Sequence, residues 1–241
     1  MLGYPEQARQ QYARMLDLLA EPLDAFAREG GIANGLFMSN FMGDNRRMLE
    51  SAQRLVAVAR ESGGTYYLGI GMIWLGRAMV VEGAIKRGLE TVAEGRDVLL
   101  NLGELASLGM VEHCAVSAYL QAARTEEGLT IIEEAITQCA AGGVRLFEAD
   151  LHRLKGELLL AASAPMTDAE DSFRKAITIA QRQQAKSWEL RATMSLARLL
   201  MKQGRRDEAR SMLTEIYNWF TEGFDTADLK DANALLDELG T

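Results

Sequence analysis

A small residue recurs about every forty residues along this chain of 241 residues. The recurring positions are Ala8, Met48, Gly88, Gly128, Ala169 and Ala209, of which only Met48 is large. Their spacings are 40, 40, 40, 41 and 40 residues, and the extra residue falls in the Ala-Pro-Met-Thr loop at 164–167. Six copies at so regular a spacing indicate an internally repeated architecture.

Each forty-residue period is predicted to hold two amphipathic helices joined by a tight turn. Core positions follow the marker after four and seven residues, as Phe173 and Ala176 follow Ala169, which places all three on one helix face. The chain has only 3 prolines and is rich in residues that lose little freedom in a helix. We therefore expect an all-helical fold with turns near Gly43, Gly83, Ala123, residues 163–167 and Gly204.

The order of residue sizes within the period resembles the tetratricopeptide repeat (TPR). A small residue such as Gly76 lies twelve positions before the marker, a larger residue follows it, and a turn precedes the second helix. The period exceeds the 34 residues of the standard TPR, and HEAT-type repeats, which share this period, are the alternative. The predicted fold class is all-α, a right-handed α-solenoid of TPR-like helix pairs with a C-terminal capping helix.

One solenoid domain is predicted over residues 1–241. Residues 1–22 form the second helix of a truncated repeat, which we expect to fray or to pack against another copy in a homodimer. The natural C-terminus is expected at the cap. The helix pairs are predicted at 23–63, 64–102, 103–143, 144–185 and 186–223, with the capping helix at 224–241.

Charge and composition disfavour nucleic acid and membrane partners. The net charge is −8, and no basic run offers a cationic face for phosphates. The most apolar stretch, residues 66–81, contains Arg77 and is shorter than the roughly 20 residues that a membrane span requires. No secretory signal is evident, and Cys114 and Cys139 are read as reduced core thiols, so a cytoplasmic location is predicted.

The sequence holds no recognisable catalytic constellation. No phosphate-binding loop ends in Lys-Ser or Lys-Thr, and Gly69-Ile70-Gly71 is interpreted as close helix packing. The two histidines lack metal-ligand spacing. We predict no cofactor, no metal and no catalytic residue, which disfavours an enzyme with its active site in the groove.

The candidate binding surface is the concave face, which the first helix of each pair is expected to line. Its aromatic and apolar residues and its three arginines suit a protein or peptide, or an acidic small effector. The alternative is that neighbouring repeats cover these residues and the arginines merely solvate the groove. The candidate site residues are Phe37, Asn40, Phe41, Arg77, His113, Ser117, Gln121, Arg153, Glu157 and Arg198.

Four segments of the C-terminal half resemble the helical-repeat region of large bacterial signalling proteins. They are ADLHRLKGELLL at 149–160, AKSWELRA at 185–192, SLARL at 195–199 and YNWFTEGFDT at 217–226. Those proteins join a class III adenylate or guanylate cyclase domain, or a DNA-binding output domain, to a MalT-like signalling ATPase that TPR-like repeats follow. The departures are Gly30, Gly31 and Gly35, which should loosen a helix that is usually rich in Ala and Leu.

The resemblance implies a regulatory sensor that binds an effector or packs on the upstream ATPase or cyclase domains. The function expected is a non-catalytic protein–protein interaction module for signal transduction. The alternative is an oligomerisation scaffold that brings output domains together.

Overall fold

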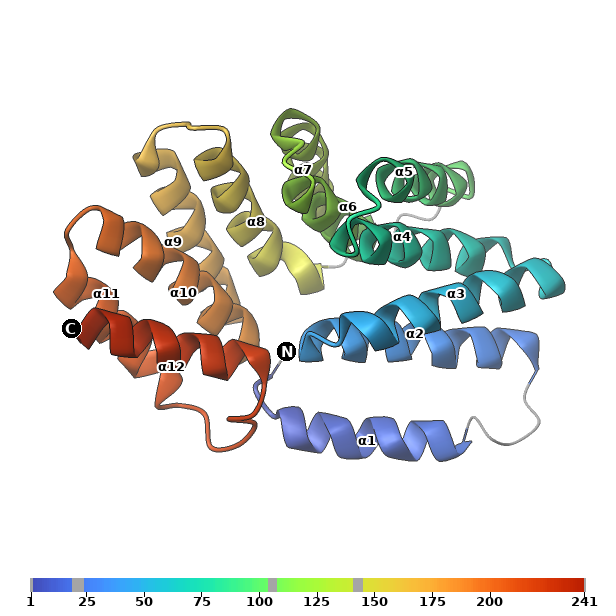
Figure 1. Ribbon diagram of the computed structural model, residues 1–241, viewed down its shortest axis with the longest axis horizontal. Coiled ribbons are helices and arrows are strands. Elements are labelled where there is room, and N and C mark those ends of the chain that lie inside the picture. The colour runs from blue at the N-terminus through green and yellow to red at the C-terminus, as the bar shows by residue number, and fades with distance from the viewer. Residues whose placement is uncertain (1, 19–23, 104–107, 141–144, 241) are drawn as a thin grey trace. The chain divides into compact units, whose positions relative to one another are not determined.

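The computed structural model describes residues 2–18, 24–103, 108–140 and 145–240. Every regular element in these ranges is helical, which confirms the predicted fold class (Figure 1). A 3-10 turn at Arg145–Phe147 precedes the eighth α-helix. The α-helices are α1 (Pro5–Leu18), α2 (Ala25–Met42), α3 (Asn45–Ser62), α4 (Thr65–Val81), α5 (Ile85–Asn101), α6 (Leu108–Gln121), α7 (Thr125–Ala140), α8 (Glu148–Ala161), α9 (Met166–Arg182), α10 (Lys186–Lys202), α11 (Arg206–Tyr217) and α12 (Ala227–Gly240).

The chain divides into two compact units, where the sequence predicts one domain. The N-terminal unit is Gln7–Arg124, and the C-terminal unit combines Thr125–Thr241 with Met1–Glu6. Helix α1 therefore begins in the C-terminal unit and continues into the N-terminal unit.

Residues with a left-handed backbone mark the turns within helix pairs and the turns between successive pairs. One series, at the predicted forty-residue spacing, separates the helices of a pair, and at Gly43 the backbone N–H closes the end of α2 on the Asn40 carbonyl. A second series lies between successive pairs, so a turn recurs about every twenty residues in the described ranges. The first series is Gly3, Gly43, Gly83, Ala123, Ser163 and Gly204, and the second is Gly63, Gly103, Gln184 and Gly223.

Helices α4 and α5 of the N-terminal unit meet backbone to backbone. A Cβ atom added to Gly76 would lie 2.4 Å from the carbonyl oxygen of Gly88, and one added to Gly88 would lie 2.6 Å from that of Gly76. A second pair, Gly69 on α4 and Gly95 on α5, repeats the close approach two turns nearer the start of α4. The small residues that the sequence assigns to close packing are therefore required by the distance between the two helices.

Helix α2 is continuous through Gly30, Gly31 and Gly35, although these glycines are expected to loosen it. Two of them give room to tyrosines from other helices. A Cβ at Gly30 would lie 2.9 Å from the Tyr67 hydroxyl, and one at Gly35 would lie 2.6 Å from the Tyr12 hydroxyl. Tertiary contacts thus offset the poor helix propensity of these residues.

The core of the C-terminal unit is built around the fully buried Phe173. Its ring lies against Gly156, where an added Cβ would meet the ring at 2.4 Å. Helix α12 closes this core with Leu229, Ala232, Leu235 and Leu239. Leu236 of the same helix packs against this core and remains partly buried.

The N-terminal helix, α1, packs on α2 through the contact of Tyr12 with Gly35. Its face bearing Ala8, Tyr12 and Met15 is half-buried. Fraying of this helix, or its pairing with another copy, stays a prediction.

Candidate functional site

Three of the candidate residues in the N-terminal unit come together on α2 and α4. Arg77 donates from Nη1 to Oδ1 of Asn40, and its guanidinium carbon lies 5.7 Å from the centre of the Trp74 ring. Phe37 stacks edge-on against the same tryptophan, with ring centres 5.4 Å apart. Arg77 therefore already has polar and aromatic partners within the N-terminal unit. The side chain of Phe41 lies outside the described residues.

The candidate residues on α6 differ in exposure. His113 is 3% exposed and Ser117 is also buried, so the prediction that both line an open surface is wrong. The Ser117 hydroxyl donates to the His113 carbonyl one turn earlier in the same helix. Gln121, at the end of α6, is exposed.

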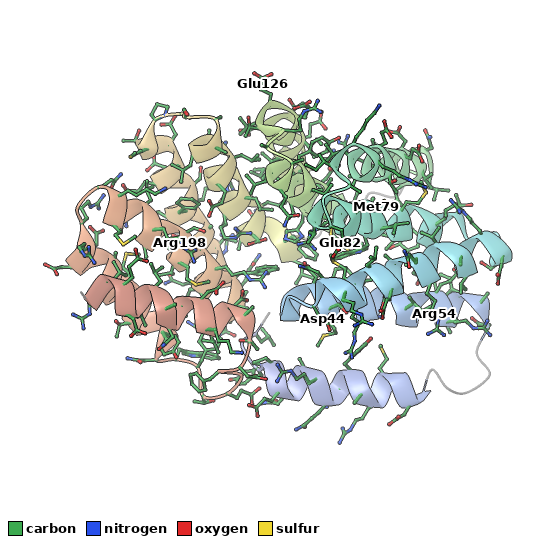
Figure 2. The ribbon with its side chains drawn as sticks, viewed as in Figure 1. Asp44, Arg54, Met79, Glu82, Glu126 and Arg198 are labelled. Atoms are coloured by element: carbon green, nitrogen blue, oxygen red, sulfur yellow. The ribbon has the colours of Figure 1, made fainter. Side chains whose placement is uncertain are left out.

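The candidate residues of the C-terminal unit also have internal partners. Arg153 binds the buried carboxylate of Asp150 through Nε and Nη2, and Glu157 accepts a hydrogen bond from the Ser195 hydroxyl. Arg198 is exposed (Figure 2). Two of the three arginines expected to bind an anionic ligand thus already have partners within the fold, because helix neighbours and adjacent repeats supply them.

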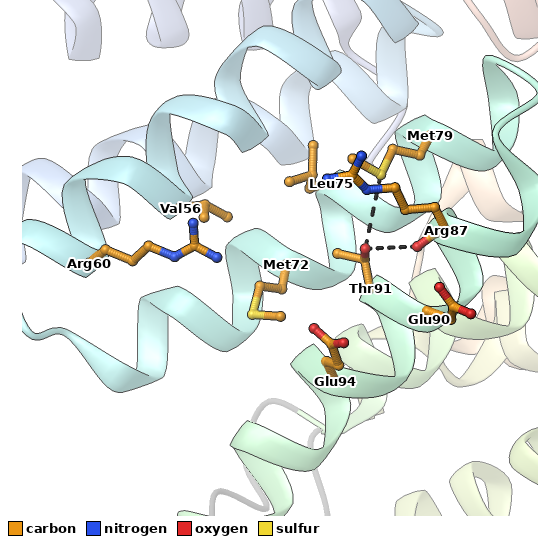
Figure 3. A pocket seen from close by; sticks show the side chains of 9 residues that line it. All are labelled: Val56, Arg60, Met72, Leu75, Met79, Arg87, Glu90, Thr91 and Glu94. Carbon is orange, nitrogen blue, oxygen red and sulfur yellow. Dashed lines mark hydrogen bonds between the residues drawn. The ribbon is translucent and has the colours of Figure 1, made fainter.

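The sequence analysis missed a pocket on the second-helix side of the N-terminal unit. It has a volume of about 320 Å³ and lies between α3 and α5, with α4 as its floor (Figure 3). We call it the α3–α5 groove. Its lining residues are Val56, Arg60, Met72, Leu75, Met79, Arg87, Glu90, Thr91 and Glu94.

The floor of the α3–α5 groove is apolar and its rim is charged. Met72, Leu75 and Met79 of α4 lie along the floor. Arg60 and Arg87 point toward the groove from opposite ends, from the last turn of α3 and the first turn of α5 (Figure 3). Exposed carboxylates from α5 complete the rim, and the Thr91 hydroxyl donates to the Arg87 carbonyl at 2.8 Å.

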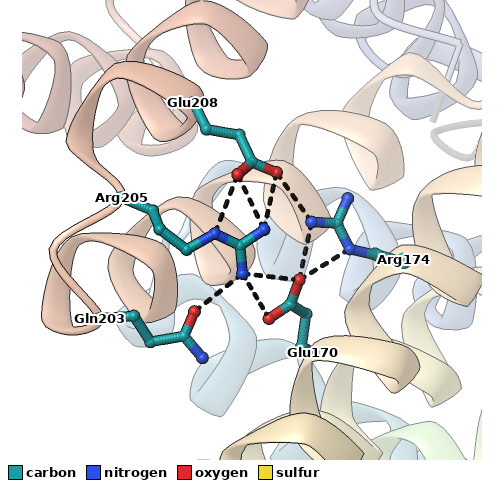
Figure 4. Close-up of polar contacts among 5 residues, drawn as sticks. All are labelled: Glu170, Arg174, Gln203, Arg205 and Glu208. Carbon is teal, nitrogen blue, oxygen red and sulfur yellow. Dashed lines mark hydrogen bonds and ion pairs between the residues drawn. The ribbon is translucent and has the colours of Figure 1, made fainter.

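In the C-terminal unit, an ion-pair network links α9 to α11 near the starts of the two helices. Arg174 contacts Glu170 at 2.7 Å and Glu208 at 2.8 Å, and Arg205 contacts the same two carboxylates at 2.9 and 2.8 Å (Figure 4).

The α3–α5 groove lacks the residues of that network. The two units correspond at an offset of 121 residues, since Ala169 matches Met48 and Ala209 matches Gly88. The positions that match Glu170, Arg174 and Arg205 are Leu49, Gln53 and Ala84. Of the residues that line the groove, only Arg87 matches a network residue, Glu208, and the other lining residues of α3 and α5 lie further along those helices. The sequence therefore gives no direct signal of the groove.

A second pocket, of about 400 Å³, lies at the capping helix. It is lined by Tyr217, Phe224, Leu229, Lys230, Asn233, Ala234 and Asp237. The rings of Tyr217 and Phe224 meet edge-on at 6.0 Å.

Two further features were sought within the described ranges. No three His, Cys, Asp or Glu side chains are grouped there so that they could hold a metal ion. None of the helices described is both long and apolar enough to cross a membrane.

No protein-family model and no curated protein matches the chain. Several solved structures are similar to it. A Signal Transduction ATPase with Numerous Domains (STAND) protein with a tetratricopeptide repeat sensor, from Pyrococcus horikoshii, has a TM-score of 0.60 and 12% identity, over 87% of this chain and 34% of that one. Nearly identical TPR-like repeats of a putative kinesin light chain from Podosopora anserina have a TM-score of 0.54 and 14% identity, over 88% and 94%.

The apo form of RapI is a third similar structure, with a TM-score of 0.57 and 12% identity over 97% of this chain and 89% of that one. Identities this low establish the fold alone. The chain has the fold of TPR-like repeat proteins.

Proposed function

We propose that this chain is a non-catalytic protein-interaction module that binds a partner helix in the α3–α5 groove. The observation that carries the proposal is a row of apolar α4 side chains between charged side chains of α3 and α5. The groove's volume lies at the lower end of the range for ligand sites, and its lining combines four apolar residues with five polar or charged ones.

The chemistry of the groove favours an amphipathic helix. Met72 and Met79 are flexible, so the floor adapts to aliphatic side chains spaced three or four residues apart. Arg60 and Arg87 would receive carboxylates at the two ends of such a helix, and Glu94 would receive a lysine or arginine between them.

The first-helix surface remains a second proposed binding surface, but in altered form. Because Arg77 and Arg153 have internal partners, the capacity for an acidic ligand on the first helices of the C-terminal unit depends mainly on Arg198. On the first helices of the N-terminal unit, the half-buried ring of Phe37, which packs on the buried Trp74, offers an apolar contact.

We infer further that the module serves as the sensor region of a multidomain bacterial signalling protein, where an ATPase or cyclase domain precedes it. The resemblance of residues 149–226 to such repeat regions supports this inference. The similarity in fold to a STAND protein with a tetratricopeptide repeat sensor supports the inference too. The matched part makes up 34% of that protein.

Peptide selection tests the groove. A display library of random sixteen-residue peptides is selected on the full chain, and the retained peptides are assayed by fluorescence anisotropy. We expect peptides with apolar residues at helical spacing and acidic ends. Met79→Glu should weaken their binding about tenfold or more, because a charge in the floor loses its water on binding.

Glu82→Lys is the matched control, because Glu82 ends α4 three residues after Met79 and does not line the groove (Figure 2). It should leave binding within about twofold. If the selected peptides bind wild type and Met79→Glu equally well, the groove is not the binding site.

A further inference from the structure

Five residues at the N-terminal end of the described chain lie against the loop between α11 and α12 of the C-terminal unit. This docking segment, residues 2–6, has the sequence Leu-Gly-Tyr-Pro-Glu. Residues Met1–Glu6 belong to the C-terminal unit although 118 residues, Gln7–Arg124, separate them from the rest of it in sequence. The surface beneath the segment, which we call the receiving surface, consists of Lys186, Trp219, Phe220, Glu222 and Gly223.

Gly3 is the residue that this surface selects most strictly. It is buried, and a Cβ there would lie 2.5 Å from the Trp219 ring and 3.0 Å from Cβ of Lys186. Its φ of 96° is also a conformation that side chains rarely allow. No residue other than glycine fits here without displacing the tryptophan.

The residues after Gly3 each make their own contact. Tyr4 meets Trp219 with ring centres 5.5 Å apart, and the ring of Pro5 fills the space beside Gly223. Glu6 is held twice: its backbone N–H donates to the Glu222 carboxylate at 3.0 Å, and its own carboxylate accepts the Gly223 N–H at 3.2 Å. Backbone hydrogen bonds, a glycine contact and an aromatic contact together resemble recognition of a short linear peptide.

The contacts are specific but few. Leu2 is 60% exposed and Tyr4 is 43% exposed, and Trp219 remains 36% exposed beneath them. The segment makes two hydrogen bonds with the receiving surface and includes the first two residues of α1. Its release therefore disturbs at most the first turn of that helix and costs far less than unfolding of the unit.

We propose that the receiving surface is a peptide-docking site for a Gly-aromatic-Pro-Glu segment whose last two residues begin a helix, and that residues 3–6 are its built-in occupant. The same four residues on another polypeptide displace them. Because the site lies in the C-terminal unit and shares no residue with the α3–α5 groove, it stands or fails independently of the function proposed above.

The test releases the segment in the full chain and supplies it again as a separate molecule. Gly3→Val adds the side chain that Trp219 excludes. We expect the variant to show stronger acrylamide quenching, because Trp219 is uncovered while Trp74 and Trp188 are 1% exposed. The acetylated and amidated peptide Leu-Gly-Tyr-Pro-Glu-Gln should then bind the variant, reverse the quenching, and bind wild type more weakly because the site is occupied.

A peptide with valine in place of its glycine is the matched control. It should bind about 10- to 100-fold more weakly, because its side chain overlaps the tryptophan ring. Tyr4→Ser, which removes the aromatic contact without adding bulk, provides a second released protein in case Gly3→Val misfolds. The proposal is overturned if a folded, released variant binds neither peptide, or binds both equally.

Discussion

At the scale of single residues, His152 is the clearest case of a titratable group set by its surroundings. The side chain is buried on α8. Burial, and then the positive charges of Lys175 and Lys155, lower its pKa to about 4 from 6.5, against an opposing effect of Glu133. The folded protein therefore keeps this imidazole neutral in a range where the unfolded chain protonates it.

This difference predicts acid sensitivity. A histidine whose pKa is lower in the folded state leaves stability intact above pH 6.5, and stability is lost as pH falls from 6.5 toward 4 because the unfolded state binds more protons. The free energy of unfolding should fall by up to about 1.4 kcal/mol per pH unit in that window. His152→Gln should remove this part of the slope, as measured by urea unfolding at pH 7.5, 6 and 5. Equal slopes for both proteins would contradict the prediction.

Single residues also show where sequence reasoning reached its limit. Turns at Ala123 and Ser163 follow from spacing, although neither residue favours a positive φ. The partner of Arg153, the Asp150 carboxylate, could not be predicted from the spacing. A residue on a first helix can extend into solvent or fold back on a carboxylate three residues earlier, and only packing decides. His113 was misplaced for a similar reason, since helix periodicity does not show how much of α6 is covered.

At the scale of helices, the ion-pair network between α9 and α11 predicts a salt-dependent contribution. Hydrogen bonds from Arg174 and Arg205 lower the pKa of Glu208, and the side chains of these three residues are each about 40% exposed. Exposed pairs are screened by salt, whereas buried pairs are screened much less. Arg174→Gln should therefore lower the melting temperature in 50 mM salt and have little effect in 1 M salt.

Asp150→Asn is the matched comparison, because the Asp150 carboxylate is fully buried against Arg153. Its destabilisation should be larger and nearly independent of salt, since removal of one partner leaves a charge inside the fold. Differential scanning fluorimetry at the two salt concentrations distinguishes the cases. If salt changes the melting temperatures of both variants equally, salt does not screen the ion pairs between α9 and α11 as predicted.

At the scale of the whole molecule, the chain holds two compact units, each with a glycine at which two helices pack too closely for any side chain. In repeat proteins stability is carried by local contacts, so damage in one place spreads little. The forty-residue period predicts all these helices alike and gives no sign of two units. Spacing alone does not encode the division into two units.

Gly76→Ala and Gly156→Ala should therefore destabilise different halves of the chain. In the first, the new methyl group lies 2.4 Å from the Gly88 carbonyl, so backbone must move. In the second, it lies 2.4 Å from the buried Phe173 ring. Each should cost about 1–3 kcal/mol, reduced by the better helix propensity of alanine. Hydrogen exchange read by mass spectrometry should rise in α4 and α5 for Gly76→Ala, and in α8 and α9 for Gly156→Ala.

Gly240→Ala is the control, because it lies at the end of α12 and an added Cβ there has no neighbour nearer than 3.8 Å. It should leave exchange in both units unchanged or slightly slower. If Gly76→Ala accelerated exchange in α8 and α9 as much as in α4 and α5, the two units would unfold as one. The division into independently stable units would then be wrong, because a common unfolding event exposes every amide together.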